Sequence, residues 1–213
     1  MTQTPTQYAE ITTVEELVEL LGEPAQRVRD KDSYALLPVH RDWLAASPFC
    51  VLATADAEGR CDASPKGDPA GSLVHVIDDT TIALAERPGN RRADGYHNIL
   101  ANPHVGLNFI IPGRGDTLRI NGRARIVRDA PWFDAMVVKG HRPQLAIVVE
   151  IEQIFFHCAK AFMRSQLWKP ETWDPEGRVP RRAVIAKAVE RDPRSEAELA
   201  EYYRPENYAK GLY

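Results

Sequence analysis

The middle of this 213-residue chain consists of short apolar or alternating runs that are separated by turn residues. The clearest run is 117–127, where Leu, Ile and Ala alternate with Thr, Asn and Arg. Such alternation is typical of a half-buried β-strand, with one face in a core and the other toward solvent or a site. Strands are expected at 49–55, 73–77, 80–85, 104–111, 117–127 and 145–156. Five or six antiparallel strands predict a mainly β fold with appended helices, either a small barrel or a strongly curved sheet.

Helices are expected on both sides of this strand-rich centre and within it. Thr13 and Glu16 form a capping box in front of apolar residues at helical spacing, and Ser195 and Glu198 form another. Further helices are predicted at 40–46, 88–101 and 129–138. We therefore expect a single domain in three parts: a helical segment at 1–47, a strand-rich core at 48–170 and a helical extension at 171–213.

Charge and cysteine content exclude several classes of protein. The chain has 27 Lys and Arg against 30 Asp and Glu, so it lacks the basic excess that neutralises nucleic acid. Its three cysteines have neither zinc-site spacing nor the density of a disulfide scaffold, which favours a reducing compartment. Residues 1–6 do not resemble a signal peptide, and no apolar run approaches the roughly 20 residues that span a bilayer. We expect a soluble cytoplasmic protein that binds neither nucleic acid nor membrane.

The segment Arg-Pro-Gly-Asn-Arg-Arg at 87–92 is the sharpest chemical feature of the sequence. It lies where a predicted strand ends and the predicted helix 88–101 begins. Amides at a helix N-terminus suit a phosphate monoester when guanidinium groups accompany them, and Gly89 permits close approach of the backbone. Arginines near a helix N-terminus oppose the helix dipole, so we favour this interpretation over a solvated basic helix start. The loop predicts a phosphorylated cofactor.

Two other patterns carry less information. Residues 62–68 include a hydroxyl and a cation, with a Pro and a Gly that interrupt an expected strand. Interrupted strands at a sheet rim can turn amides toward a ligand, although a plain turn explains the segment equally well. Lys160, Arg164 and Trp168 recur every four residues and would share one face of a helix. That face could bind a ligand or form a solvent-facing stripe.

Signatures of several other enzyme classes are missing from the sequence. It contains no Walker-type loop, dinucleotide glycine fingerprint, Gly-x-Ser-x-Gly elbow or His-Glu-x-x-His helix. The six histidines show no ligand spacing, so no metal site is expected. Cys61 could act as a nucleophile only beside a base, and the sequence shows none for it.

Three segments taken together resemble the FMN-binding split-barrel family related to pyridoxamine 5'-phosphate oxidase. They are 47–68, which ends on Ala-Ser-Pro-Lys-Gly-Asp, the loop and helix at 87–100, and 111–124, which ends on Thr-Leu-Arg-Ile-Asn-Gly-Arg-Ala. Their order, spacing and expected elements agree with the family over roughly residues 30–170. The likeness is greatest to a bacterial subgroup known only as candidate FMN-dependent enzymes, not to the oxidase itself.

The resemblance implies a six-stranded antiparallel split barrel with an FMN-binding core at 48–170. It also implies a homodimer with two FMN molecules at the subunit interface. By position, the residues along the flavin ring would be Ala63, Ser64, Pro65, Lys66 and Gly67. Asn90, Arg91 and Arg92 would hold the phosphate, and Thr117 would contact the ring. Lys160, Arg164 and Trp168 would reach the flavin from the partner subunit.

The function that the resemblance implies is an FMN-dependent oxidoreductase, acting on an unidentified small organic substrate by hydride transfer at the flavin. Lys66 or Lys160 near the ring would stabilise the reduced flavin. The oxidase's C-terminal Arg-x-His set has no counterpart at 202–208, so vitamin B6 oxidation is not expected. The alternatives are a non-catalytic flavin-binding or redox-sensing protein, and a split barrel that binds haem or a deazaflavin.

Overall fold

The computed structural model describes residues 8–213, apart from the side chains of residues 175 and 176. Residues 1–6, in which no signal peptide is expected, lie outside this range. By internal contacts the chain divides into two units, with the boundary between residues 32 and 33. The predicted segment 1–47 therefore spans the first unit and the first helix of the second.

The first unit contains two short helices, α1 (Val14–Leu21) and α2 (Gln26–Arg29). Helix α1 begins at the predicted capping box. The Glu16 amide donates to Thr13 Oγ1 at 3.2 Å, and the Thr13 amide donates to the Glu16 carboxylate at 3.3 Å. Each side chain satisfies an amide that has no partner within the helix.

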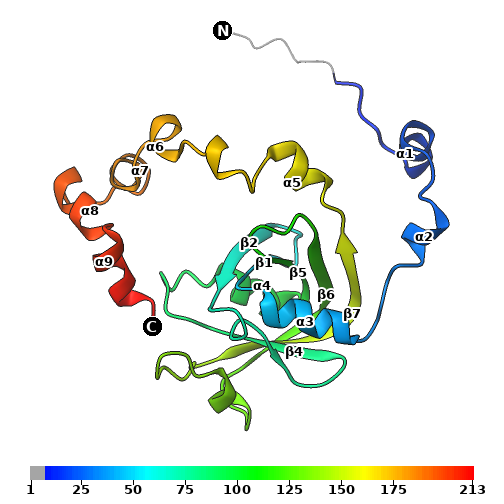
Figure 1. Ribbon diagram of the computed structural model, residues 1–213, viewed down its shortest axis with the longest axis horizontal. Coiled ribbons are helices and arrows are strands. Elements are labelled where there is room, and N and C mark those ends of the chain that lie inside the picture. The colour runs from blue at the N-terminus through cyan, green and yellow to red at the C-terminus, as the bar shows by residue number, and fades with distance from the viewer. Residues whose placement is uncertain (1–7) are drawn as a thin grey trace. The chain divides into compact units, whose positions relative to one another are not determined.

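The second unit is built around a seven-stranded antiparallel sheet with the strand order β2-β1-β5-β6-β7-β4-β3 (Figure 1). The strands are β1 (Phe49–Ala55), β2 (Cys61–Gly67), β3 (His75–Val76), β4 (Thr81–Ala85), β5 (His104–Ile110), β6 (Thr117–Val127) and β7 (Ala146–His157). The mainly β fold is confirmed. The expected split barrel has six strands, whereas this sheet has seven and is not closed by hydrogen bonds, because β2 and β3 remain at its edges.

Strand β2 corrects the expectation of an interrupted strand at 62–68. It pairs with β1 in unbroken register, from Phe49 opposite Gly67 to Ala55 opposite Cys61. Pro65 is tolerated there because β2 is an edge strand, where a missing backbone N–H removes no bond from a second neighbour. Its small and polar side chains gave no apolar alternation, so the sequence did not predict a seventh strand.

The main core lies on one face of the sheet. The register aligns Leu52, Leu107, Ile120 and Ile154 across four neighbouring strands, and all four are buried. Burying such a side chain stabilises a fold by about 1.5–3 kcal/mol. Helix α3 (Pro38–Ala46) adds Trp43 and Leu44 to the same core.

A second, smaller core lies against β4 and β7 and consists of Ala83, Phe133, Met136, Ala146 and Val148. The predicted helix at 129–138 is reduced here to the short 3-10 helix η1 (Phe133–Met136). Its two large side chains are buried, so packing sets the conformation of this segment.

A bulge in the longest strand pair bends the sheet. The register of β6 against β7 shifts between Asn121 and Gly122. A Cβ atom at Gly122 would collide with the carbonyl oxygen of Glu150, so only glycine fits this approach. Bulges increase local twist, which curves the sheet around its core.

Helix α4 (Asp94–Ala101) is shorter than the predicted helix 88–101. Arg91 and Ala93 have left-handed backbone conformations, with φ of 59° and 57°, which end any helical run before Asp94. After β7 the chain forms α5 (Lys160–Ser165), η2 (Pro170–Thr172), α6 (Pro175–Arg178), α7 (Arg182–Val189), α8 (Glu196–Tyr202), α9 (Pro205–Tyr208) and η3 (Ala209–Gly211). The predicted capping box at Ser195 and Glu198 starts α8. None of the described helices is both long and apolar enough to cross a bilayer.

Candidate functional site

A cavity of about 830 Å³ lies between β2, the loop that follows β4, the first turn of α4 and residues 212–213. Eight predicted site residues line it: Ala63, Ser64, Pro65, Lys66, Gly67, Asn90, Arg91 and Arg92. The strand and the loop are separated by more than twenty positions in the sequence, and the fold brings them together around one space. This is the arrangement that the predicted cofactor site requires.

The β2 side chains alternate along the cavity. Ser64 and Lys66 pair in register with the buried residues Leu52 and Cys50, so they belong to the core-facing side of the sheet. Ala63 and Pro65 lie on the opposite face. Burial raises the pKa of the Cys50 thiol to about 12, so this cysteine stays protonated beside Lys66.

One carboxylate oxygen, Glu86 Oε2, binds two side chains from different elements. The Lys66 ammonium is 3.2 Å from it, and the Tyr96 hydroxyl donates to the same oxygen. The Lys66 Nζ also lies 5.0 Å from the centre of the Tyr96 ring. Burial and the Glu86 hydrogen bond raise the pKa of Tyr96 well above its usual range, so the phenol remains a neutral donor.

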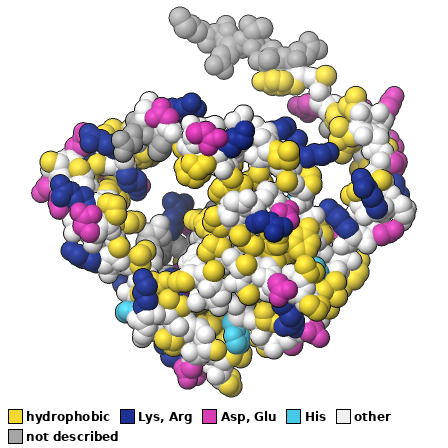
Figure 2. Space-filling view, in the orientation of Figure 1, with side chains coloured by type: hydrophobic (Ala, Val, Ile, Leu, Met, Phe, Trp, Pro, Cys, Tyr) yellow, Lys and Arg dark blue, Asp and Glu magenta, His cyan; other side chains and the backbone are white. Residues whose placement is uncertain are grey.

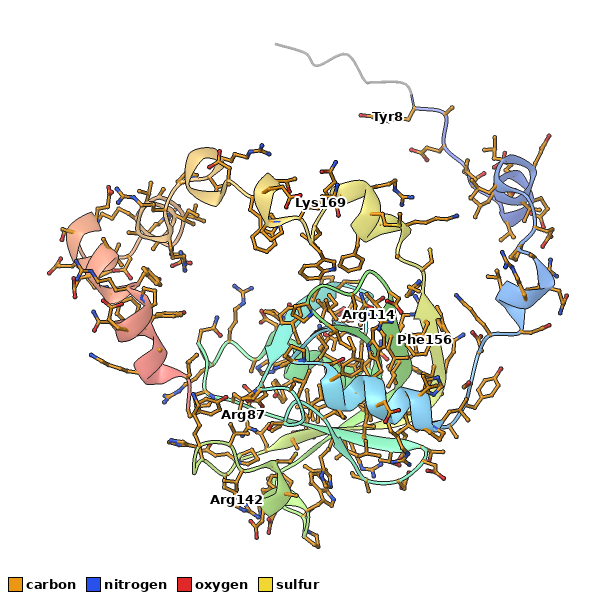
Figure 3. All side chains as sticks on the ribbon, viewed as in Figure 1. Tyr8, Arg87, Arg114, Arg142, Phe156 and Lys169 are labelled. Carbon is orange, nitrogen blue, oxygen red and sulfur yellow. The ribbon has the colours of Figure 1, made fainter. Side chains whose placement is uncertain are left out.

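Arg87 belongs to the framework of the loop. Its Nε donates to Asp68 Oδ2 at 2.8 Å, and its NH2 donates to the Met136 carbonyl at 2.9 Å. The Asp68 side chain is only 3 % exposed, and its other oxygen accepts the Tyr213 hydroxyl at 2.9 Å. The Arg87 guanidinium lies 5.8 Å from the centre of the Tyr213 ring (Arg87 is labelled in Figure 3). These contacts fix the start of the loop to β2 and to the last residue of the chain.

The other two loop arginines differ in their partners. Arg92 Nε donates to Asp94, the first residue of α4. Arg91 has no hydrogen bond or ion pair with any residue that the structure describes.

Asp62, like Asp94, lies at the N-terminal end of α4, since its carboxylate would be 3.4 Å from a Cβ atom on Gly95. Two carboxylates therefore already lie at the N-terminus of α4, and a phosphate would depend on the loop arginines rather than on the helix amides.

The charges that line the cavity balance. Four basic and four acidic side chains contribute to it. Three pairs form, Lys66 with Glu86, Arg87 with Asp68 and Arg92 with Asp94. The remaining two are Arg91 and Asp62, whose carboxylate accepts the Ser64 hydroxyl at 2.6 Å. Arg91 is thus the cavity's one cation without a carboxylate partner among residues 8–213. On the face that Figure 2 shows, basic and acidic side chains are likewise interspersed.

The remaining predicted site residues lie elsewhere in the chain. Thr117 is buried at the start of β6, opposite His157. Lys160 and Arg164 share helix α5, but this helix ends at Ser165, so the predicted face common to both and Trp168 is wrong. Gln166 has a left-handed conformation that ends the helix. Trp168 instead donates its ring N–H to the Arg114 carbonyl at 2.6 Å.

Sequence reasoning missed Glu86, Tyr96 and Tyr213 as lining residues. Glu86 directly precedes the arginine loop, so its position could have drawn attention to it. Tyr96 gave no signal beyond its place in a predicted helix. Tyr213 is 145 positions from its partner Asp68, and no local pattern reports such a contact. Within the described part of the chain, no group of three or more His, Cys, Asp or Glu side chains could hold a metal ion.

A family profile matches the part of the chain that contains most of the cavity's lining residues. Residues 36–158 match the sequence profile of the family described as pyridoxamine 5'-phosphate oxidase, and this range includes both walls of the cavity from β2 to α4. A search of curated proteins gives no match.

Solved structures similar to this chain include HupZ of Group A Streptococcus, with 21 % identity and a TM-score of 0.46 over 57 % of this chain and 93 % of that one. A candidate pyridoxamine 5'-phosphate oxidase of Lactobacillus delbrueckii has 22 % identity and a TM-score of 0.45, covering 58 % and 95 %. The haem storage protein HutZ of Vibrio cholerae has 16 % identity and a TM-score of 0.41, covering 58 % and 94 %. The family profile matches more than half of the length of this chain, so the chain belongs to the pyridoxamine 5'-phosphate oxidase family.

Proposed function

We propose that this protein binds FMN in the cavity and is an FMN-dependent oxidoreductase acting on a small organic substrate. The observation that carries the proposal is Arg91, a guanidinium without a partner among the described residues, on the rim of a cavity within the family's matched region. A forked guanidinium suits a phosphate monoester, and this one is not engaged elsewhere.

The residues present fit FMN. The cavity volume of about 830 Å³ is within the range of small-molecule sites, which is about 300–1,000 Å³. Strand β2 is an edge of the sheet, so its outer backbone N–H and C=O groups are available to the polar atoms of a flavin ring. Arg91 and Arg92, with the Asn90 side chain, would hold the phosphate.

When bound, FMN would supply hydride transfer, and the protein would supply position and electrostatics. Leu52 and Leu73 line the cavity and would keep water from the ring. Tyr96 keeps its proton and can donate a hydrogen bond only if it leaves Glu86. Lys66 is held in place by the same carboxylate.

We also propose that the protein is a homodimer. The register places Pro65, Val51, Asn108, Arg119 and Phe155 in one row across five strands, on the face away from the main core. In this row, Asn108 Oδ1 and Arg119 Nε are buried without a hydrogen-bond partner among the described residues. Each such atom costs about 1–3 kcal/mol. A second copy on this face would satisfy both atoms if the two side chains rearranged toward it, because both atoms are already closed to solvent within the single chain.

In the dimer, the partner's α5 would bring Lys160 and Arg164 to the flavin, as the resemblance implies. Trp168 would contribute its ring face, because its N–H is already bonded to Arg114. Thr117 would act from the same covered face of the sheet. Sedimentation measurements on the purified protein test the dimer, and a monomer that binds FMN tightly would refute an interface site.

The decisive experiment for the function is reconstitution with FMN followed by a visible spectrum and a turnover assay. We expect a flavin band that persists through gel filtration, and oxidation of NADH or NADPH in the presence of an acceptor. Flavin retention without turnover over a broad acceptor panel would support the alternative of a cofactor store or redox sensor.

A haem or a deazaflavin would show its own visible spectrum in the same experiment. Haem would need Tyr96 or Tyr213 as its axial ligand, since none of the cavity's described lining residues is His, Cys or Met, and both tyrosine hydroxyls are bonded to carboxylates. The phosphate of a deazaflavin would fit Arg91 equally well, so here the spectrum decides.

A further inference from the structure

The strongest unassigned feature of the cavity is the convergence of Lys66 and Tyr96 on Glu86. The three residues come from β2, from the end of β4 and from α4. Both donors reach one oxygen, Oε2, and none of the described residues donates to the other. The Lys66 side chain is 18 % exposed and that of Glu86 is 32 % exposed, so solvent screens the pair only in part.

The Lys66 ammonium is so close to the Glu86 carboxylate that the pair exerts only a weak electric field on other groups. The 3.2 Å separation places the two opposite charges almost together, and their effects on a third group largely cancel. The cavity wall as a whole contains four basic and four acidic side chains, so it offers no surplus of positive charge. A bound phosphate would make the occupied cavity negative.

We propose that Glu86 is a positioning residue that masks Lys66 and thereby holds the reduction potential of a cavity-bound flavin low. This inference rests on the proposed function. Accepting a hydride places negative charge on the flavin ring, which a nearby cation stabilises and a neutral ion pair does not.

The first test uses the protein without cofactor. Glu86→Gln keeps the shape and an acceptor oxygen but removes the charge, so the Lys66 nitrogen loses its ion-pair partner and becomes free to react. Acetylation of Lys66 by acetic anhydride, followed by peptide mass spectrometry, should be several-fold faster than in the wild type. The exposed Lys169 serves as internal reference.

Glu58→Gln is the matched control, because Glu58 pairs with Arg60 on the exposed surface. It should leave Lys66 acetylation unchanged. Tyr96→Phe removes the second donor without touching the ion pair and should also leave the rate near that of the wild type. An unchanged Lys66 rate in Glu86→Gln would overturn the masking role.

The second test measures the midpoint potential of FMN bound to each variant. Glu86→Gln should shift the potential in the positive direction, Lys66→Met should shift it in the negative direction, and the double variant should return near the wild type. Glu86→Asp keeps the charge and should restore the wild-type value.

Equal potentials in the wild type and Glu86→Gln would refute the tuning role. If the wild type takes up no FMN, the proposed function fails instead. The acetylation experiment would then still decide whether Glu86 masks Lys66.

Discussion

The two walls of the cavity are held in place by different kinds of interaction. The strand wall, β2, is held by a continuous hydrogen-bonded register against β1, which determines the face of each side chain. The loop wall, residues 86–93, has no such ladder. It depends on ion pairs at its two ends and passes through two left-handed residues, Arg91 and Ala93.

This difference separates residues that maintain the fold from residues that are available to a ligand. Arg87 donates hydrogen bonds to Asp68 and to the Met136 carbonyl, and Arg92 is paired with Asp94. Only Arg91, in the least supported part of the loop, is without a partner among the residues described. Three arginines of one short segment therefore include one that supports the fold, one that is paired within the loop and one without a partner among the described residues.

The largest expected effect is on the anchored end of the loop. Arg87→Met leaves the Asp68 carboxylate buried without its cation, which should lower the free energy of unfolding by about 3–5 kcal/mol. Urea unfolding measures it. Arg142→Met is the control, because Arg142 makes exposed pairs with Asp129 and Asp134 and should cost under about 1 kcal/mol (both arginines are labelled in Figure 3). Equal losses would mean that Arg87 has no special role.

The second effect concerns the ligand rather than the fold. Replacing Arg91 and Arg92 together by Ala removes two charge-assisted contacts of about 1.5–3 kcal/mol each, so the Kd for FMN should rise about 100-fold or more. Titration followed by flavin fluorescence gives the value. The single Arg91→Ala variant should account for most of the loss, since Arg92 is shared with Asp94. A Kd within threefold of the wild type would show that the phosphate binds elsewhere.

A smaller effect tests the left-handed conformations. Ala93→Gly removes the steric cost of a positive φ and should stabilise the protein by about 0.5–1 kcal/mol. Ala200→Gly, within helix α8, should instead destabilise it by about 1 kcal/mol. Thermal unfolding of both variants provides the comparison. Destabilisation of similar size in both would show that Ala93 is not strained.

The smallest effect is expected on the strand wall. Pro65→Val should change the free energy of unfolding by no more than about 0.5 kcal/mol. The edge strand β2 has a neighbour on one side only, so the new backbone N–H forms no additional hydrogen bond between strands. The reverse change at its register partner, Val51→Pro in the central strand β1, should be far more damaging. If both variants unfold at similar urea concentrations, then β1 tolerates proline as well as β2 does, and the contrast between an interior and an edge strand is wrong.

The sequence predicted elements whose signals are local. The bounds of β1 and β6 agree with the prediction, because β1 is a short apolar run before a turn and β6 alternates in apolarity, and both capping boxes form as expected. Strand β2 was predicted to be interrupted because it contains Pro65 and Gly67, but both are tolerated in this edge strand.

Two features were not predicted: the left-handed residues Arg91 and Ala93, which delay the start of α4, and the role of Arg87, which depends on Asp68 from a distant segment. The members of the cavity were predicted in part. Residues from β2 and the loop were found through a resemblance, whereas the Glu86–Tyr96 contact needed the fold.

The contact between Tyr213 and Asp68 has a consequence for the order of synthesis. The two residues are 145 positions apart, so at roughly 5–20 residues per second the ribosome adds Tyr213 on the order of ten seconds after Asp68. During this interval β2, the arginine loop and α4 can emerge and pack while the rim contributed by Leu212 and Tyr213 does not yet exist. A ligand present during translation would therefore meet a wider entrance than one that arrives after Leu212 and Tyr213 have packed.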